Sequence, residues 1–293
     1  MTAYDPKKWT SHLFDIEGSM VREIMGRVSL CVAWSAVVVG LYQYGPDAFD
    51  SLAIAESAHA LIGTSLGLLL VFRTNSSYDR FWEGRKQWGG IVNETRNLAR
   101  QAETWFASDR ELASRFIHWT IAYAFATMHR LRNTYGIGAA SQGLPDDEVQ
   151  AVQLSGHVPL AVARKLTALM HDARQRGLID SIQLQALDQN VQLLIDYCGA
   201  CERIRSTPAP FAYVVHLRRA LILYCFTLPL ALVHRFGWET VPVTLIITYV
   251  MLGIEEIGVE IENPFNLTIN DLPLESLCDT IDRDLKEILN SEV

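Results

Sequence analysis

Positive charge is absent from two long stretches of this 293-residue chain. Residues 28–72 contain no Lys or Arg, and residues 220–282 contain a single one, Arg235. A soluble chain of this length rarely leaves such gaps, so they favour membrane-spanning segments. The formal net charge is −8, from 25 Lys+Arg and 33 Asp+Glu. This deficit of positive charge argues against a nucleic-acid-binding protein.

Several sequence motifs are also missing. The phosphate loop G-x-x-x-x-G-K-[ST], the nucleophile motif G-x-S-x-G and the zinc motif H-E-x-x-H do not occur, and the eight His residues do not cluster. We find no β alternation of useful length and no pattern of a cleavable signal peptide. An apolar content of 49% excludes a disordered chain. The sequence therefore predicts an all-α protein without a visible catalytic residue set, and we expect neither enzymatic activity nor a cofactor.

Four apolar stretches are arranged as two hairpins. Residues 28–44 and 52–72 are joined by GPDAFD, and residues 216–233 and 240–259 are joined by HRFGWE. A membrane-spanning helix needs roughly 20 mostly apolar residues. Basic residues flank the hairpins on the side away from both connectors, which predicts that both termini and the middle region are cytoplasmic. We expect a cytosolic segment 1–27, a transmembrane hairpin 28–72, a cytosolic helical domain 73–215, a second hairpin 216–259 and a cytosolic tail 260–293.

The middle region is predicted to be helical. Apolar spacing favours helices over 82–135, 159–176 and 181–205, whereas glycines, a proline and an acidic run favour a loop over 136–157. Gly177 is expected to end a helix in the left-handed conformation. Cys198 and Cys201 form a C-x-x-C motif, the pattern of some redox and metal sites. Both cysteines lie on a regular apolar stripe, so we interpret them as core residues with free thiols.

The second apolar stretch has two distinct faces. Ile62, Leu66 and Leu70 form a line with one residue per turn, beside a face of small residues that includes Gly63 and Gly67. Such a line could contact lipid, lie in a core or form the wall of a narrow hydrophobic pore. Glu56 and His59 lie at the outer end of the same helix. Ionisable groups at membrane depth usually face water or a partner, so we predict an ion-attracting outer entrance there.

Four acidic residues crowd the inner end of the last apolar stretch: Glu255, Glu256, Glu260 and Glu262. A solvated helix end is one interpretation. A vestibule that attracts cations is the other, because rings of carboxylates have that effect in oligomeric channels.

Three stretches resemble the prokaryotic bestrophin family. LLLVFRTNSSYDRFWEGRKQWG at 68–89 is similar to the family's signature, and YDPKKW at 4–9 and ENPF at 262–265 fit the same pattern. The resemblance covers essentially the whole chain. It implies a homopentameric ion channel with four transmembrane helices per subunit and a cytosolic helical bundle, in the bacterial inner membrane. The implied partners are other copies of the chain, membrane lipids and permeant monovalent ions.

The resemblance also implies two constrictions of the pore. Three residues on the second transmembrane helix, one per turn, form a hydrophobic neck in the family. Aligning the family pattern on Trp88 places the neck on Ile62, Leu66 and Leu70. Aligning it on Gly67 gives a less apolar line of Ala60, Thr64 and Leu68. A second constriction near the cytosolic exit falls on Ile179.

Two departures from the animal members bear on function. Animal bestrophins follow Asn-Pro-Phe with a dense acidic run that helps to bind Ca²⁺. Here the segment that follows, NLTINDLPLES, contains only Asp271 and Glu275 as acidic residues. They are the candidate metal ligands, and we expect no calcium clasp. Phenylalanines line the neck in animal members, and their positive ring edges can contact anions, whereas Leu66 and Leu70 have no such edge. We therefore predict a channel for small monovalent cations, with an anion (chloride) channel or a non-conducting membrane scaffold or regulator as alternatives.

Overall fold

The computed structural model describes residues 18–46 and 54–290. The 4–9 motif, most of the predicted segment 1–27, part of the first connector and the last three residues lie outside this range. The structure is 83% helical, with no strand in the described part of the chain. The chain divides into two compact units. Unit 1 contains Met1–Arg80, Pro208–Asn263 and Thr268–Asn270, and unit 2 contains the remainder.

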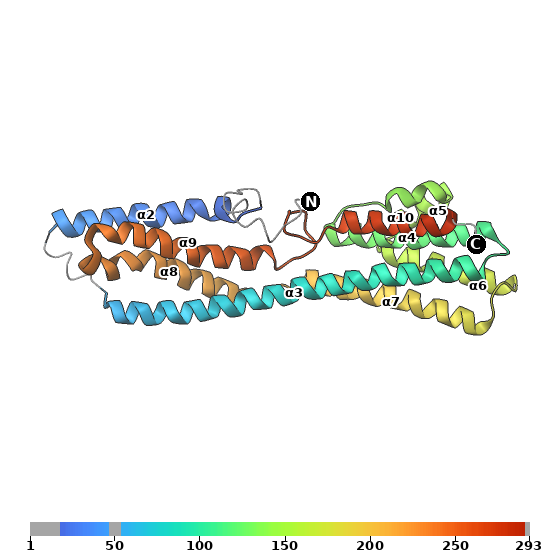
Figure 1. The fold of residues 1–293 in the computed structure, drawn as a ribbon, viewed down its shortest axis with the longest axis horizontal. Helices are drawn as coiled ribbons and strands as arrows, with labels where there is room; N and C mark the ends of the chain where they lie inside the picture. Colours follow the sequence, from blue (N-terminus) through green and yellow to red (C-terminus); the bar gives the residue numbers. More distant parts are fainter. Residues whose placement is uncertain (1–17, 47–53, 291–293) are drawn as a thin grey trace. The chain divides into compact units, whose positions relative to one another are not determined.

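Unit 1 holds the predicted apolar stretches. They lie in α2 (Val21–Tyr44), the first part of α3 (Glu56–Trp105), α8 (Phe211–Phe236) and α9 (Thr240–Glu260), and a 3-10 turn (Gly237–Glu239) joins the last two (Figure 1). α2 packs against α8 and α9. Three segments have the length and hydropathy to cross a membrane: Val21–Tyr44, Glu56–Trp105 and Phe211–Glu260. α3 continues without a break past residue 72, where the sequence predicts the end of the first hairpin.

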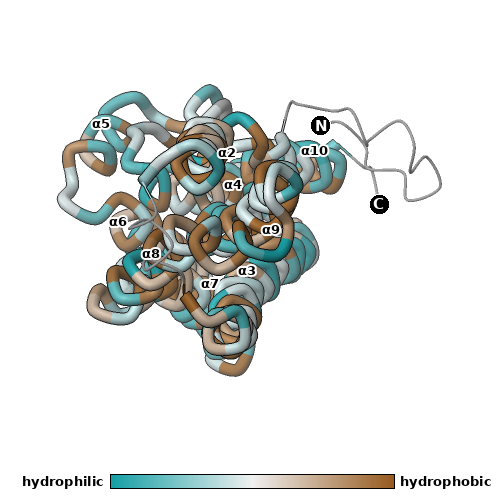
Figure 2. The backbone as a smooth tube through the Cα atoms, turned by 90° about the vertical axis from the view of Figure 1, so that its left-hand side faces the viewer, coloured by the Kyte–Doolittle hydropathy of each residue, from teal (hydrophilic) through white to brown (hydrophobic). Residues whose placement is uncertain are grey.

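Polar and aromatic contacts join α2 to α8 and α9. Trp34 stacks on Phe226 with ring centroids 4.5 Å apart, and its indole nitrogen donates to the Phe226 carbonyl at 2.9 Å. The buried hydroxyls of Ser35 and Thr244 lie 3.3 Å apart. Small and hydroxyl-bearing residues of this kind hold helices together where lipid removes the hydrophobic driving force. The remaining surface of these helices is rich in exposed apolar residues, among them Leu30, Val37, Ile222, Leu223 and Ile246, and Figure 2 shows the hydrophobic residues recurring along them.

Unit 2 is a helical bundle around α4. Its helices are the second part of α3, α4 (Arg110–Arg132), η2 (Gly138–Gly143), α5 (Asp146–Gln153), α6 (Val158–Gln175), α7 (Ser181–Ser206) and α10 (Leu274–Asn290). α4 packs against α6, α10 and η2 and is buried over most of its circumference. Trp88, Trp119, Phe106 and Phe116 are fully buried in this core. The helical structure predicted over 82–135 is confirmed and consists of two helices, because α3 ends at Trp105 and Asp109 caps α4.

The helices predicted over 159–176 and 181–205 are confirmed as α6 and α7. Gly177 has a φ of +74°, which confirms the left-handed position predicted for it. The loop predicted over 136–157 is wrong, because this segment contains η2 and α5. Its acidic run Asp146, Asp147 and Glu148 forms the first turn of α5. Acidic side chains are favourable there because they oppose the positive end of the helix dipole.

Candidate ion pathway

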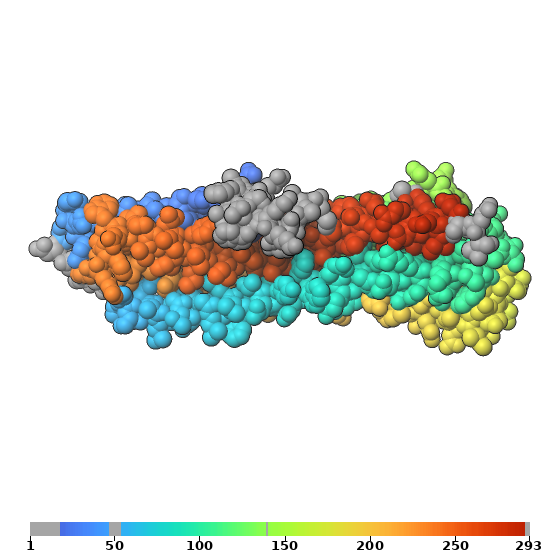
Figure 3. Space-filling model, in the orientation of Figure 1, coloured from blue at the N-terminus to red at the C-terminus, as the bar shows by residue number. Residues whose placement is uncertain are grey.

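Within unit 1, α3 has one face inside the unit and one face outside it. His59, Gly63, Leu66 and Leu70 are buried against neighbouring helices, whereas Leu61, Ile62, Leu68, Val71 and Phe72 are exposed. In the space-filling view, the first part of α3, in light blue, forms part of the visible surface (Figure 3). A side chain that lines a channel between subunits must be accessible in the single subunit. The outward face is therefore the part of α3 that can contribute to an ion pathway.

The three predicted neck residues do not share this face. Ile62 is 53% exposed, but Leu66 and Leu70 are only 4% and 1% exposed. Both leucines belong to a core cluster with Leu221, Tyr224 and other residues of α2, α8 and α9. The spacing of one residue per turn in the sequence carries no information on which side of α3 is covered by α8. In the single subunit, Ile62 is thus on the exposed surface, whereas Leu66 and Leu70 are in the core.

The alternative line of Ala60, Thr64 and Leu68 is exposed along its length. One further turn along α3 lies Phe72, which is 58% exposed, compared with 56% for Leu68. The Thr64 hydroxyl donates to the Ala60 carbonyl at 3.0 Å, so it is satisfied within the helix. Sequence reasoning missed Phe72, although continuing the alternative line by four residues identifies it.

Gly63 packs against α8. A Cβ atom at this position would lie 2.5 Å from the Tyr224 hydroxyl, so no larger residue fits without a shift. At Gly67, by contrast, a Cβ atom would have no neighbour within 4 Å. The small-residue face thus serves close helix packing at Gly63 only. His59 lies beside this contact, where its ring stacks on Tyr224 at 4.3 Å and contacts the Thr227 hydroxyl at 3.1 Å. Burial at 4% exposure leaves His59 inside unit 1, away from its outward face.

Ion pairs with arginines involve Glu56, Glu255 and Glu256 of unit 1. At the outer end, Glu56 pairs with Arg235 at 3.0 Å. At the inner end, the 2%-exposed Glu255 pairs with Arg218 at 2.8 Å and with Arg27 at 3.7 Å. Arg27 also pairs with Glu256.

Glu262 is held from three directions. Its carboxylate accepts from Arg73 at 2.6 Å and from the Ala209 amide at 2.7 Å, and its carbonyl accepts from Arg80 at 3.0 Å. Burial raises the pKa of Glu262, but the bonds from Arg73 and Ala209 outweigh it and the net shift is downward. Glu260 contacts Asn270 at 3.5 Å. Glu255, Glu256 and Glu262 therefore join segments of unit 1 through ion pairs with arginines.

In unit 2, Ile179 is 3% exposed and belongs to the hydrophobic core. Ile182, three residues later in the first turn of α7, is 76% exposed. Asp180 caps this helix and forms a capping box with Gln183, which fixes the position of the turn. The accessible apolar residue of this segment is thus Ile182, which sequence reasoning missed.

The two C-x-x-C cysteines lie in the core of unit 2. Cys198 and Cys201 are 2% and 0% exposed. Burial raises the pKa of Cys198 to about 11 and that of Cys201 further still. A thiol that stays protonated at pH 7 is a poor nucleophile and a poor metal ligand. The interpretation of these residues as core thiols agrees with this burial.

The candidate metal ligands are not brought together. Glu275 pairs with Arg132, and Asp271 is 9% exposed. Among the described residues, no group of three or more His, Cys, Asp or Glu side chains has a geometry that could hold a metal ion.

Comparison with known proteins identifies the class of this membrane protein. The family model described as Bacterial/Fungal Bestrophin protein matches residues 1–287, so the chain belongs to this family. It is 38% identical over 288 residues to a voltage-dependent anion channel-forming protein of Synechocystis sp., with 97% of this chain and 92% of the relative covered. A protein of the same description from Nostoc sp. is 37% identical over 288 residues, with 96% and 92% covered.

A solved structure shares the fold. The crystal structure of a bacterial bestrophin homologue from Klebsiella pneumoniae matches with a TM-score of 0.86 and 29% identity, covering 92% of this chain and 100% of that one. The family resemblance and the all-α membrane fold predicted from the sequence are thereby confirmed. Family and relatives point to an ion channel rather than an enzyme. They give no support to the predicted preference for cations, because the relatives are described as anion channel-forming.

Proposed function

We propose that this chain is the subunit of a homopentameric anion channel in a bacterial inner membrane. In this proposal α2, α3, α8 and α9 cross the bilayer, and both termini are cytoplasmic. The exposed apolar residues of α2, α8 and α9 support contact with lipid. The distribution of basic residues supports the orientation, since cytoplasmic flanks are enriched in Lys and Arg.

The outward face of α3 is the observation that carries the proposal. Five copies of this face around an axis would enclose a pathway lined by Thr64, Leu68 and Phe72, one residue per turn. A narrow apolar ring controls conduction because an ion must shed water there without receiving replacement ligands. Ile182 is the corresponding candidate for a second, cytosolic ring, since it is the exposed apolar residue of its segment.

Two features of unit 1 favour anions over cations. Three of the four inner acidic residues, Glu255, Glu256 and Glu262, are paired with arginines, which compensates most of their negative charge. Phe72 places an aromatic ring on the accessible face of α3, and the positive edge of such a ring can contact an anion. The sequence argument for cations relied on the absence of a phenylalanine edge at Leu66 and Leu70 and on the net charge of −8. The line proposed here instead contains Phe72.

A reversal-potential measurement tests this function. The purified protein would be reconstituted in a planar bilayer with a KCl gradient, and we expect the reversal potential to lie close to the chloride equilibrium potential. A value close to the potassium potential would contradict anion selectivity while leaving the channel assignment intact. Assembled oligomers that never conduct, at any voltage, would favour a non-conducting scaffold instead.

A further inference from the structure

Unit 2 contains a polar cavity that the proposed ion pathway does not use. It lies between the C-terminal end of α4 and the connection from α5 to α6, and its volume is about 560 Å³. Small-molecule sites commonly have volumes of roughly 300–1,000 Å³. The cavity is therefore large enough for an organic molecule and far larger than a single inorganic ion requires.

The walls of this cavity are rich in hydrogen-bond donors and free of acid. His129, Arg130, Asn133, Thr134 and Gln153 contribute polar side chains, and no Asp or Glu is among the described residues that line it. Tyr135, which is 91% exposed, adds an aromatic ring to the lining. This composition combines a wall of hydrogen-bond donors with an aromatic surface for a carbon skeleton.

Two carbonyl groups in the last turn of α4 already accept hydrogen bonds. The His129 carbonyl accepts from the amides of Asn133 and Thr134, and the Arg130 carbonyl accepts from Arg205 at 3.0 Å. Asn133 makes this turn possible by adopting a left-handed conformation with φ 54°. These bonds compensate the negative end of the helix dipole, which would otherwise oppose an anion. Val158 of the opposite wall begins α6, so the positive end of that helix lies at the cavity.

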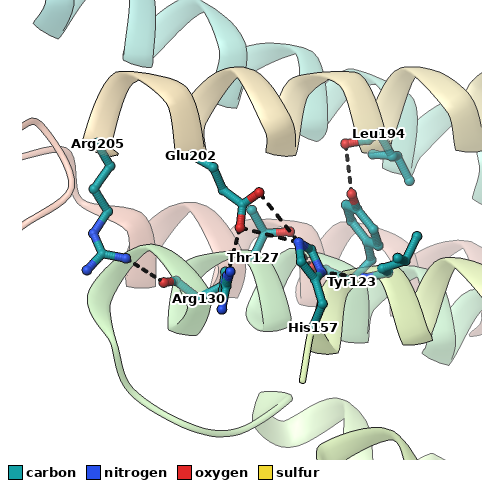
Figure 4. Close-up of polar contacts among 8 residues, drawn as sticks. Tyr123, Thr127, Arg130, His157, Leu194, Glu202 and Arg205 are labelled. Carbon is teal, nitrogen blue, oxygen red and sulfur yellow. Dashed lines mark hydrogen bonds and ion pairs between the residues drawn. The ribbon is translucent and has the colours of Figure 1, made fainter. Parts of the chain in front are cut away.

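The side chain of Arg130 is positioned by Glu202, which does not line the cavity. Its Nε atom donates to Glu202 at 2.7 Å, and Glu202 also contacts His157 (Figure 4). In the described part of the chain the terminal nitrogens of Arg130 make no hydrogen bond or ion pair, and the side chain is 46% exposed. A guanidinium fixed in this way presents a planar fork that matches carboxylate and phosphate groups.

We propose that this cavity is a binding site for a small organic anion that carries a carboxylate or phosphate group. Arg130 contacts the anionic group, Asn133 and Gln153 supply amide hydrogen bonds, and the organic part of the ligand lies against Tyr135. The site is separate from the proposed ion pathway, because none of Thr64, Leu68, Phe72 and Ile182 lines the cavity.

Calorimetric titration of the full-length protein in detergent tests the proposal. Succinate and glycerol 3-phosphate are the anionic probes, and succinamide and glycerol are their neutral counterparts. We expect saturable binding of at least one anion and none of the neutral compounds. Binding of succinate alone would assign the site to carboxylates, and binding of glycerol 3-phosphate alone would assign it to phosphate esters.

Paired variants separate the cavity from the general charge of the protein. Gln153→Glu adds a carboxylate to the lining and should weaken binding by about tenfold or more. Gln150→Glu makes the same change on an exposed position of α5 outside the lining, and should alter affinity by less than about twofold. Arg130→Lys keeps the charge but removes the fork, and should also weaken binding. The proposal is overturned if neither anion binds, if the neutral compounds bind equally well, or if both glutamine variants have the same effect.

Discussion

The guanidinium of Arg73 lies 2.6 Å from the Glu262 carboxylate, and the arginine side chain is only 2% exposed. This pair connects α3 to the chain that follows α9. The Ala209 amide, just before α8, donates to the same carboxylate at 2.7 Å. One acidic residue thus holds three segments of unit 1 that are far apart in the sequence.

Glu262→Ala should strongly destabilise the protein. The substitution leaves the buried Arg73 without its partner, and an uncompensated buried charge costs about 3–5 kcal/mol of folding free energy. Thermal denaturation of the detergent-solubilised protein measures the loss. Glu260→Ala is the control, because among the described residues Glu260 makes a long contact of 3.5 Å with Asn270 and no ion pair. Equal stability of the two variants would contradict the structural role of Glu262.

Glu255→Gln should change stability but not ion selectivity. Glu255 is buried between Arg27 and Arg218, and loss of a charged hydrogen-bonding partner costs about 2 kcal/mol. Because this carboxylate is neutralised within the subunit, the reversal potential should stay at the wild-type value. A shifted reversal potential at unchanged melting temperature would instead make Glu255 part of an ion-attracting vestibule.

Leu66 and Leu68 should respond differently to truncation. Leu66→Ala creates a cavity in the core of unit 1 and should cost about 3 kcal/mol of stability. Leu68→Ala removes an exposed side chain from the proposed neck, so it should widen the neck and raise single-channel conductance with little loss of stability. Melting curves and bilayer recordings on both variants distinguish the two roles. Raised conductance in Leu66→Ala alone would restore the line predicted from the sequence.

The thiols of Cys198 and Cys201 should be inert in the folded protein. Burial removes them from reagents and raises their pKa, so the reactive thiolate is scarce at neutral pH. Mass spectrometry after maleimide treatment should find both unmodified under native conditions and modified in denaturant. The double variant Cys198→Ser with Cys201→Ser should retain conduction. Loss of conduction in correctly assembled double variants would revive a thiol-dependent activity.

The contact of Glu202 with Arg130 and His157 should make part of the stability pH-dependent. Burial raises the pKa of Glu202. The hydrogen bond from Arg130 and the interaction with His157 lower this pKa by more, so the net shift is to below the ordinary value of 4.5. A lowered native pKa contributes stability that is complete above the ordinary value and is lost as the pH falls through the native value. Glu202→Gln should therefore be about 1 kcal/mol less stable than wild type at pH 7.

The stability difference between wild type and Glu202→Gln should shrink to nearly zero once the pH has fallen below the native pKa. Denaturant melts at several pH values measure this convergence. A difference that is constant with pH would mean that the carboxylate charge of Glu202 contributes nothing.

Most helices of this protein can be predicted from the local sequence, and the incorrect predictions also arise from local sequence patterns. Val158–Gln175 and Ser181–Ser206 follow from apolar periodicity and from Gly177 between them. The segment 136–157 was misread because Pro145 and the acids after it resemble a loop, although the same residues begin helix α5.

The candidate pathway was less predictable. The spacing of Ile62, Leu66 and Leu70 gave no information on the direction of the core. That direction depends on Tyr224 and Leu221, which are more than 150 residues away in the sequence. The same limit applies to the acidic cluster, since no local pattern pairs Glu255 with Arg27.

The two gaps in Lys and Arg by themselves indicated a membrane protein with long apolar segments, because charged side chains are costly in hydrocarbon. The long motif at 68–89 determined its family. Only the tertiary structure decided that Leu68 and Phe72 are accessible while Leu66 is buried. It also decided that arginines pair with Glu255, Glu256 and Glu262. These properties arise from contacts between segments far apart in the chain, which composition and periodicity do not encode.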